Sequence, residues 1–132
     1  MPPQATVVHE HQCELEGWDD PAPGLVQWRT LISGDRTPTQ GLTQGIAEVR
    51  ASSLTRPRLH RHAQPETYYI ISGQGVISLD GEERALGPGD AVFIPGAAWH
   101  AAWCVGEEPL RILYSFAADS FDQVIYEFAD LA

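Results

Sequence analysis

Four side chains of the kinds that bind divalent metals occur in the central part of the chain. Two are histidines one residue apart, one is a glutamate that follows them, and one is a later histidine; they are His60, His62, Glu66 and His100. Imidazole nitrogens and carboxylate oxygens together suit borderline divalent metals, and Mn, Fe, Co, Ni and Zn all accept such a set. The sequence therefore predicts one divalent transition metal held by these four ligands.

The alternation of side chains along a strand explains how these ligands can meet. Residues two apart in a strand point to the same face, so His60 and His62 project together. Glu66 opens the next strand after a short turn, and His100 can return from a neighbouring strand. Four protein ligands leave two positions open on an octahedral ion, where a substrate can bind. By the same alternation, Tyr68 shares the inward face of Glu66.

The elements around these ligands are predicted to be short strands. Turns rich in Gly and Pro interrupt the chain roughly every eight to twelve residues, which favours an all-β sandwich or barrel. The clearest hairpin has Asp80-Gly81 between two alternating segments. We expect residues 1–24 to form an N-terminal arm, with one short helix or strand between Val7 and Leu15, and residues 25–132 to form the domain. The tail from Asp119 onward is predicted to be a final strand or a short helix.

Two longer patterns resemble the motifs of the cupin family. The first motif, HxH followed by Glu and Gly, is matched by the first three ligands and Gly73; the second is matched by Gly89, Pro95 and His100. The resemblance implies a double-stranded β-helix, a jelly-roll barrel with the metal inside. Three positions depart from the motifs and concern loop geometry rather than the ligands; they are Leu54, Ala97 and Cys104.

Within the cupins, the chain resembles the lyases that cleave dimethylsulfoniopropionate (DMSP) to dimethyl sulfide and acrylate. The segments that carry this resemblance are HRHAQPETYY, GPGDAVFIPGAAWH and LYSFAADSFDQVIYEF. The resemblance implies that Tyr68 is the base of a β-elimination on DMSP or a related β-substituted carboxylic acid, and that Tyr126 belongs to the site. A phenol has a pKa near ~10, and a neighbouring divalent cation favours its phenolate form.

Other aromatic residues are candidates for binding the cationic end of such a substrate, because cations are attracted to aromatic faces. Trp28 and Tyr114 are the preferred candidates, since each can line the mouth of a barrel. We expect most of the other large aromatic side chains, Trp99, Trp103 and Phe93, to pack in the core.

Two other functions remain open: an iron dioxygenase that uses the same ligands, and a non-catalytic cupin that binds a small molecule. A formal net charge of −10 disfavours nucleic acid and anionic membrane surfaces as partners. The N-terminal residues do not resemble a signal peptide, and the two cysteines form no disulfide framework, so we expect a cytoplasmic protein. The sequence does not fix the oligomeric state, and a homodimer is one of the two states considered, beside the monomer.

Overall fold

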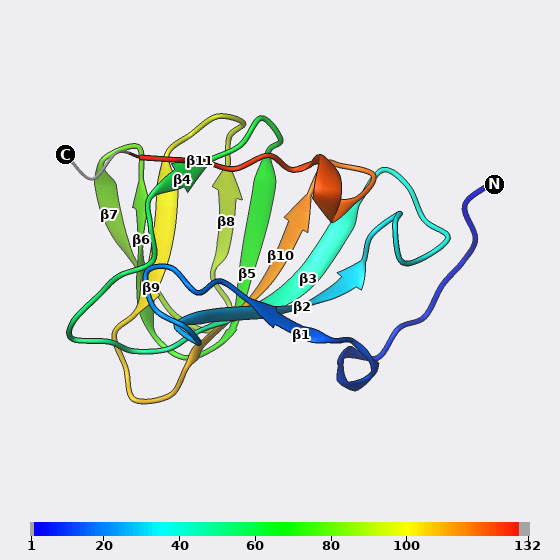
Figure 1. The fold of residues 1–132 in the computed structure, drawn as a ribbon. Coiled ribbons are helices and arrows are strands. Elements are labelled where there is room, and N and C mark those ends of the chain that lie inside the picture. The colour runs from blue at the N-terminus through cyan, green and yellow to red at the C-terminus, as the bar shows by residue number, and fades with distance from the viewer. Residues whose placement is uncertain (1, 130–132) are drawn as a thin grey trace.

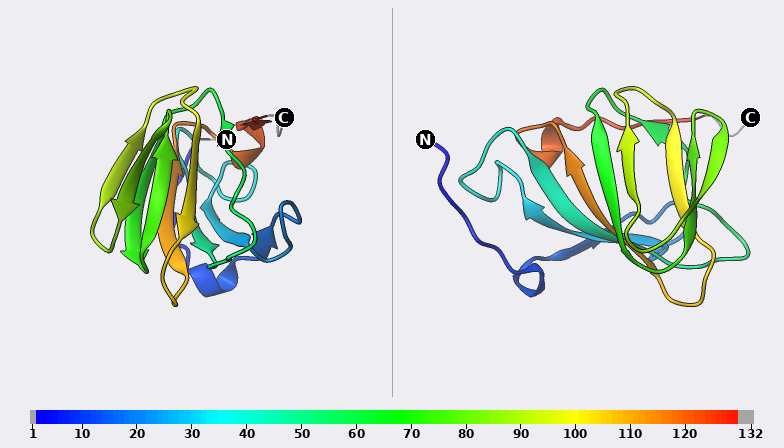
Figure 2. Two further views of the ribbon diagram at one scale, coloured as in Figure 1. Left: turned by 90° about the vertical axis from the view of Figure 1, so that its left-hand side faces the viewer. Right: turned by 180° about the vertical axis from the view of Figure 1, so that it is seen from behind.

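The computed structural model describes residues 2–129, which form two antiparallel β-sheets facing each other (Figure 1). The larger sheet has six strands, in the order β1 (Leu15–Gly17), β2 (Val26–Ile32), β3 (Thr43–Val49), β10 (Leu110–Phe116), β5 (Glu66–Ser72) and β8 (Ala91–Ile94). The smaller sheet has five, in the order β11 (Glu127–Phe128), β4 (His60–Arg61), β9 (His100–Cys104), β6 (Gly75–Leu79) and β7 (Glu82–Leu86). The turned views in Figure 2 show the two layers that enclose the interior. The predicted all-β jelly-roll barrel is confirmed.

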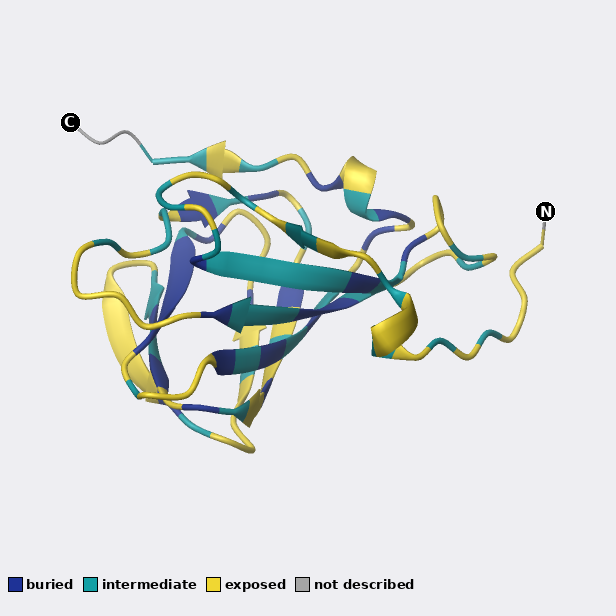
Figure 3. Cartoon of the chain, turned by 60° about the horizontal axis from the view of Figure 1, so that its bottom comes forward, coloured by how far each residue is buried: buried dark blue, intermediate teal, exposed yellow. Residues whose placement is uncertain are grey.

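The core lies between the sheets and follows the alternation of each strand. In β10 every second residue is buried, and Ile112 and Phe116 are almost completely so. The strand pairs with β3 on one side and β5 on the other, where Ile70 is fully buried. Figure 3 shows the buried segments gathered inside the barrel and the exposed ones on its rim and loops. Burial of one face of each strand therefore fixes the register of the sheets.

The predicted hairpin is confirmed, with β6 and β7 joined at Asp80-Gly81. Both turn residues have positive φ angles, 49° for Asp80 and 87° for Gly81. A two-residue hairpin turn of this kind matches the twist of the strands that it joins, which explains the preference for Asp-Gly.

The two ends of the chain add short elements to the barrel. The 3₁₀ helix η1 (Glu10–Gln12) lies inside the predicted N-terminal window. The arm then continues into β1, which pairs with β2 as an edge strand of the larger sheet. The tail forms both predicted kinds of element, the 3₁₀ helix η2 (Phe121–Gln123) and then β11. The predicted domain end at residue 132 lies outside the described residues.

Neither helix in the described part of the chain has the length or hydropathy needed to cross a membrane.

Candidate active site

The four predicted metal ligands lie near one another at one end of the barrel, around the starts of β4, β5 and β9. His60 in β4 pairs directly with His100, the first residue of β9. Glu66 is the first residue of β5, in the opposite sheet. His62 follows β4 in the turn that leads to Glu66. The predicted orientation is confirmed, since both histidines of the HxH pair are buried while Arg61 between them is half-buried.

Three of these residues form a tight cluster of ligand atoms. His62, Glu66 and His100 are all buried, and each offers one ligand atom within 4.8 Å of the others. Oε1 of Glu66 lies 3.1 Å from Nε2 of His62 and 3.3 Å from Nε2 of His100. A His/Glu/His cluster of this size can hold a metal ion.

The hydrogen bonds of the imidazoles determine which nitrogen is free to bind. Nδ1 of His62 donates to the carbonyl of Gln64 over 2.9 Å, and Nδ1 of His100 donates to the carbonyl of Ala98 over 2.9 Å. Because a carbonyl can only accept, Nδ1 of each ring carries the hydrogen, and Nε2 is the nitrogen that is left to bind a metal. Backbone carbonyls orient metal-binding histidines in this way in many metalloproteins.

The cluster therefore brings together atoms that repel one another unless a proton or a metal ion lies between them, and Nε2 of His62 is within hydrogen-bond distance of Oε1 of Glu66. Two imidazole Nε2 atoms and a carboxylate oxygen converge in a buried space, and Nε2 of His100 has no hydrogen-bond partner in the described part of the chain. An acceptor buried in this way is costly unless it is paired. A divalent cation is the partner that this donor set fits.

His60 lies beside this cluster rather than within it. Its ring centroid is 4.4 Å from that of His100 and 6.3 Å from that of His62. Its Nδ1 donates to the carbonyl of Arg58 over 2.8 Å, so Nε2 is again the free nitrogen. Burial, followed by the charge of His100, lowers the pKa of His60 to about 4. The ring is therefore neutral near pH 7, which is the form that binds metals, and a fourth ligand at His60 stays a prediction.

A cavity next to the cluster joins it to the predicted catalytic and substrate-binding residues. His60 and Glu66 line it together with Tyr68, the three predicted substrate-binding residues and further aromatic side chains. Its volume is about 70 Å³. A single water needs roughly 10–15 Å³ on this measure, so the cavity admits a small molecule.

Tyr68 is placed as the alternation of β5 predicts. Glu66 and Ile70 on the same face are buried, whereas Tyr69 on the other face is 49% exposed. The ring centroid of Tyr68 lies 6.5 Å from that of His100. Burial and then the charge of Glu66 raise the pKa of Tyr68 well above its ordinary value. The protein alone therefore holds Tyr68 as a neutral phenol.

The predicted substrate-binding residues also line the cavity. The ring centroid of Tyr126 is 5.2 Å from that of His60 and 5.4 Å from that of His62. Trp28 and Tyr114 enter from β2 and β10. Their polar atoms, the Trp28 Nε1 and the Tyr114 hydroxyl, are buried without a hydrogen-bond partner among the described residues.

Sequence reasoning missed three further aromatic residues that line the cavity, Trp18, Phe116 and Phe121. Trp18 follows β1 in the predicted arm, and Phe121 opens η2 in the tail. Both reach the cavity through contacts between distant parts of the chain, which no local pattern reveals. Phe93 was expected in the core, and that prediction is wrong, because Phe93 points outward from β8 and is 63% exposed.

The loop before His100 contains a strained residue at a position where the sequence departs from the cupin motif. Ala97, which replaces the motif glycine, has a φ of 65°. The matching glycines Gly73 and Gly89 have φ angles of 85° and 92°. Left-handed backbone favours glycine, so the motif pattern records a requirement of the backbone. Ala97 keeps the turn by donating its amide to the carbonyl of His62 over 2.8 Å.

Comparisons with known proteins agree with this fold and extend the similarity to an enzyme. Residues 48–116 match the Cupin domain family. The chain is 39% identical over 127 residues to dimethylsulfoniopropionate lyase DddW of Ruegeria pomeroyi, covering 96% of this chain and 80% of that protein.

Two solved structures have the same fold at low sequence identity. The polyketide cyclase RemF of Streptomyces resistomycificus superposes with a TM-score of 0.76 and 21% identity, over 98% of this chain and 88% of that one. A cupin 2 conserved barrel domain protein of Rhodopseudomonas palustris superposes with a TM-score of 0.72 and 20% identity, over 90% and 79% of the two chains.

Proposed function

The chain belongs to the cupin family, and on this premise we propose that it is a metal-dependent lyase. The proposed reaction is β-elimination on DMSP or a related β-substituted carboxylic acid, giving dimethyl sulfide and acrylate from DMSP. The observation that carries the proposal is the cavity, which joins Glu66 of the metal-ligand cluster to Tyr68 and a set of aromatic rings. The similarity to a DMSP lyase over nearly the whole chain supports it.

The proposed ligands are His62, Glu66 and His100, with His60 as the fourth. A divalent cation bound there would polarise a substrate carboxylate, acidify the carbon next to it and favour the phenolate of Tyr68. The identity of the metal, the homodimer and the cytoplasmic location stay predictions from the sequence.

Tyr68 is the proposed base. Its oxygen takes the proton from the α-carbon, and the electrons of the broken C–H bond form the double bond between the α- and β-carbons. The bond from the β-carbon to sulfur breaks at the same time, and its electron pair leaves with the sulfur as dimethyl sulfide. Tyr126 adjoins His60 and His62, and we propose that it helps to orient the substrate at the cluster.

Anaerobic assay of the metal-loaded protein tests the proposal. DMSP incubated without oxygen should give equal amounts of acrylate and dimethyl sulfide, with Mn or Ni as well as with Fe, because β-elimination consumes no oxidant. An iron dioxygenase would instead require Fe and take up oxygen in proportion to its product. Turnover only under those two conditions would overturn the lyase. Elimination from another β-substituted acid, with none from DMSP, would change the substrate and keep the reaction.

A further inference from the structure

Trp18, on the N-terminal segment, forms part of the wall of the cavity next to the metal-ligand cluster. Its ring meets those of Trp28 and Tyr126 edge-to-face, with both centroid distances at 5.3 Å. It also lies 5.9 Å from the ring of His60 and 5.8 Å from that of Phe128. The N-terminal segment thus supplies a central ring to the aromatic side of the cavity.

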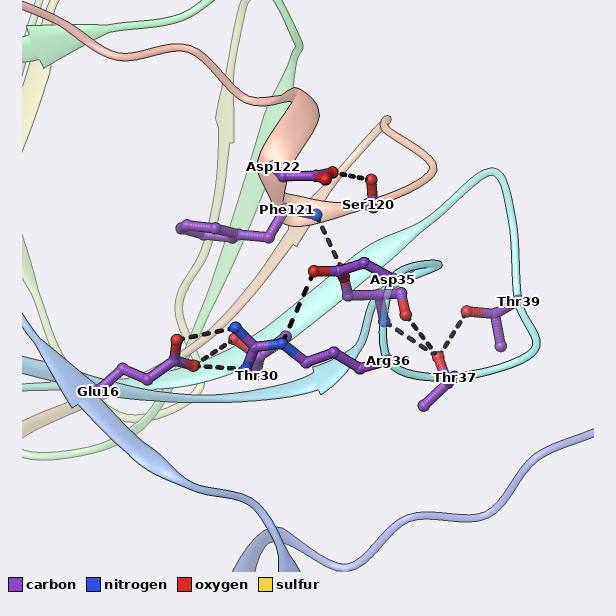
Figure 4. A network of polar contacts seen from close by, with 10 residues as sticks. Glu16, Thr30, Asp35, Arg36, Thr37, Thr39, Ser120, Phe121 and Asp122 are labelled. Carbon is purple, nitrogen blue, oxygen red and sulfur yellow. Dashed lines mark hydrogen bonds and ion pairs between the residues drawn. The ribbon is translucent and has the colours of Figure 1, made fainter.

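The residues around Trp18 fix it in this place. Two residues before it, Glu16 accepts hydrogen bonds from Nη1 and Nη2 of Arg36, at 2.7 and 2.8 Å (Figure 4). Glu16 also accepts a hydrogen bond from the hydroxyl of Thr30 at 2.9 Å. Two residues after it, Asp20 pairs with Arg58 over 2.8 Å. Trp18 is therefore held between two ion pairs to separate parts of the barrel.

The same region also positions Phe121, a second aromatic residue whose ring contacts that of Trp28. The amide of Phe121 donates to the hydroxyl of Ser33 over 2.9 Å, and that hydroxyl donates to Asp35, which pairs with Arg36 (Figure 4). Phe121 stacks on Trp28 at a centroid distance of 5.9 Å and an interplanar angle of 27°. The loop after β2 thus anchors both chain ends that contribute rings to the cavity.

The chemistry of this wall favours a positively charged group. Aromatic faces attract cations, most strongly where water is excluded, and Trp does so best. Among the described residues that line the cavity there is no Lys or Arg to compete for these faces or to repel a cation. The guanidinium of the nearby Arg58 instead lies over the ring of Phe128, 4.5 Å from the ring centroid.

We infer that Trp18, together with Trp28 and Tyr126, binds the onium group of the substrate and so selects carboxylic acids that carry a methylated sulfonium or ammonium at the β-carbon. This inference rests on the proposed function for the place of the carboxylate, at the metal-ligand cluster. It makes the N-terminal segment a part of the substrate site and Trp18 a residue that determines specificity.

Two isosteric probes separate charge recognition from the filling of an apolar space. 3-(Trimethylammonio)propionate and 4,4-dimethylpentanoate have the same shape, but only the first carries a cation. Calorimetric titration of the metal-loaded wild-type protein should give a dissociation constant at least tenfold lower for the ammonium probe. Trp18→Leu should reduce this preference about tenfold, and Trp18→Phe should give an intermediate value. Trp99→Leu, which removes a half-buried tryptophan outside the cavity lining, should keep the full preference.

Equal affinity of the wild-type protein for both probes, or an unchanged preference in a folded Trp18→Phe or Trp18→Leu protein, would overturn the inference. These outcomes differ from a failure of the lyase. A preference for the ammonium probe that depends on Trp18, without elimination from DMSP or from any other β-substituted acid, would refute only the lyase. Release of dimethyl sulfide with a preference that does not depend on Trp18 would refute only the role of Trp18.

Discussion

At the scale of single residues, two features of the site both favour a bound cation. Nε2 of His62 and Nε2 of His100 converge on the carboxylate of Glu66 in a buried space. Burial and Glu66 also raise the pKa of Tyr68, which keeps its proton. A single bound cation would relieve the repulsion in the cluster and lower the pKa of the phenol, so the proposed metal site and the proposed base depend on each other.

Tyr68→Phe tests the base directly, because it removes the oxygen and keeps the ring. Turnover should fall by about a hundredfold or more, the scale of lost general-base catalysis, while metal content and melting temperature stay near those of the wild type. Tyr69→Phe is the matched control, since Tyr69 is the next residue on the exposed face of β5 and should keep full activity. Full activity in a folded Tyr68→Phe protein would show that the Tyr68 hydroxyl is not the base and that the side chain only packs in the barrel.

Ala97→Gly should stabilise the protein, because Ala97 has a positive φ of 65° and is exposed. A left-handed conformation costs a residue with a Cβ about 1–2 kcal/mol, and the greater freedom of glycine in the unfolded chain offsets part of the gain. We expect the free energy of unfolding to rise by about 0.5–1 kcal/mol in urea titrations. Ala101→Gly in β9 should lower it, since Ala101 is buried in a regular strand. A loss of stability in Ala97→Gly would contradict the account of the motif glycine.

At the scale of elements, sequence patterns could predict those parts of the fold that local chemistry determines. The Asp80-Gly81 hairpin and the alternation of β5 follow from turn chemistry and from the period of a strand, and both are confirmed. The spacing of His60 and His62 likewise predicted their shared face.

The rest of the site depends on contacts that no local pattern encodes. Trp18 reaches the cavity only because β1 pairs with β2, and Phe121 only because the tail returns across the loop after β2. β4 also ends at Arg61, so His62 lies in the turn that leads to Glu66 and not in the strand. A pattern of residue types shows neither how a chain end returns nor where a short strand stops.

The ion pair that anchors β1 predicts a dependence of stability on pH. The hydrogen bond from Arg36 lowers the pKa of Glu16 below its ordinary value of 4.5. A carboxyl whose pKa is lower in the folded state stabilises the fold above the unfolded value and loses this contribution as the pH falls through the folded value. Glu16→Gln should therefore cost about 1 kcal/mol at pH 7 and progressively less below about pH 4.

Urea titrations of the wild-type protein and of Glu16→Gln, both with a chelator present, measure this difference without a contribution from metal. Glu82→Gln is the control, because its pair with Arg84 is highly exposed, with side chains 73% and 70% accessible. It should change stability little at any pH. A cost of Glu16→Gln that is the same at pH 7 and pH 3 would contradict the role of the Glu16 charge.

At the scale of the whole molecule, the site lies where both sheets and both chain ends meet. The ligands come from the starts of β5 and β9 in opposite sheets, and the aromatic wall comes from the N-terminal segment and the tail. A metal bound at this junction would hold separate parts of the chain together. Its binding free energy should then contribute to the stability of the entire barrel.

Removal of the metal should consequently lower the melting temperature of the whole protein in a single transition. A ligand at a thousand times its dissociation constant stabilises a fold by about 4 kcal/mol, which corresponds to a fall of about 10 °C or more on chelation for a domain of this size. His62→Ala should bind much less metal by elemental analysis, and its melting temperature should no longer respond to the chelator. His9→Ala is the matched control, because His9 and His11 repeat the HxH spacing on an exposed segment, away from the cluster. It should keep one metal per chain and the full response, whereas unchanged metal content in His62→Ala would refute the ligand assignment.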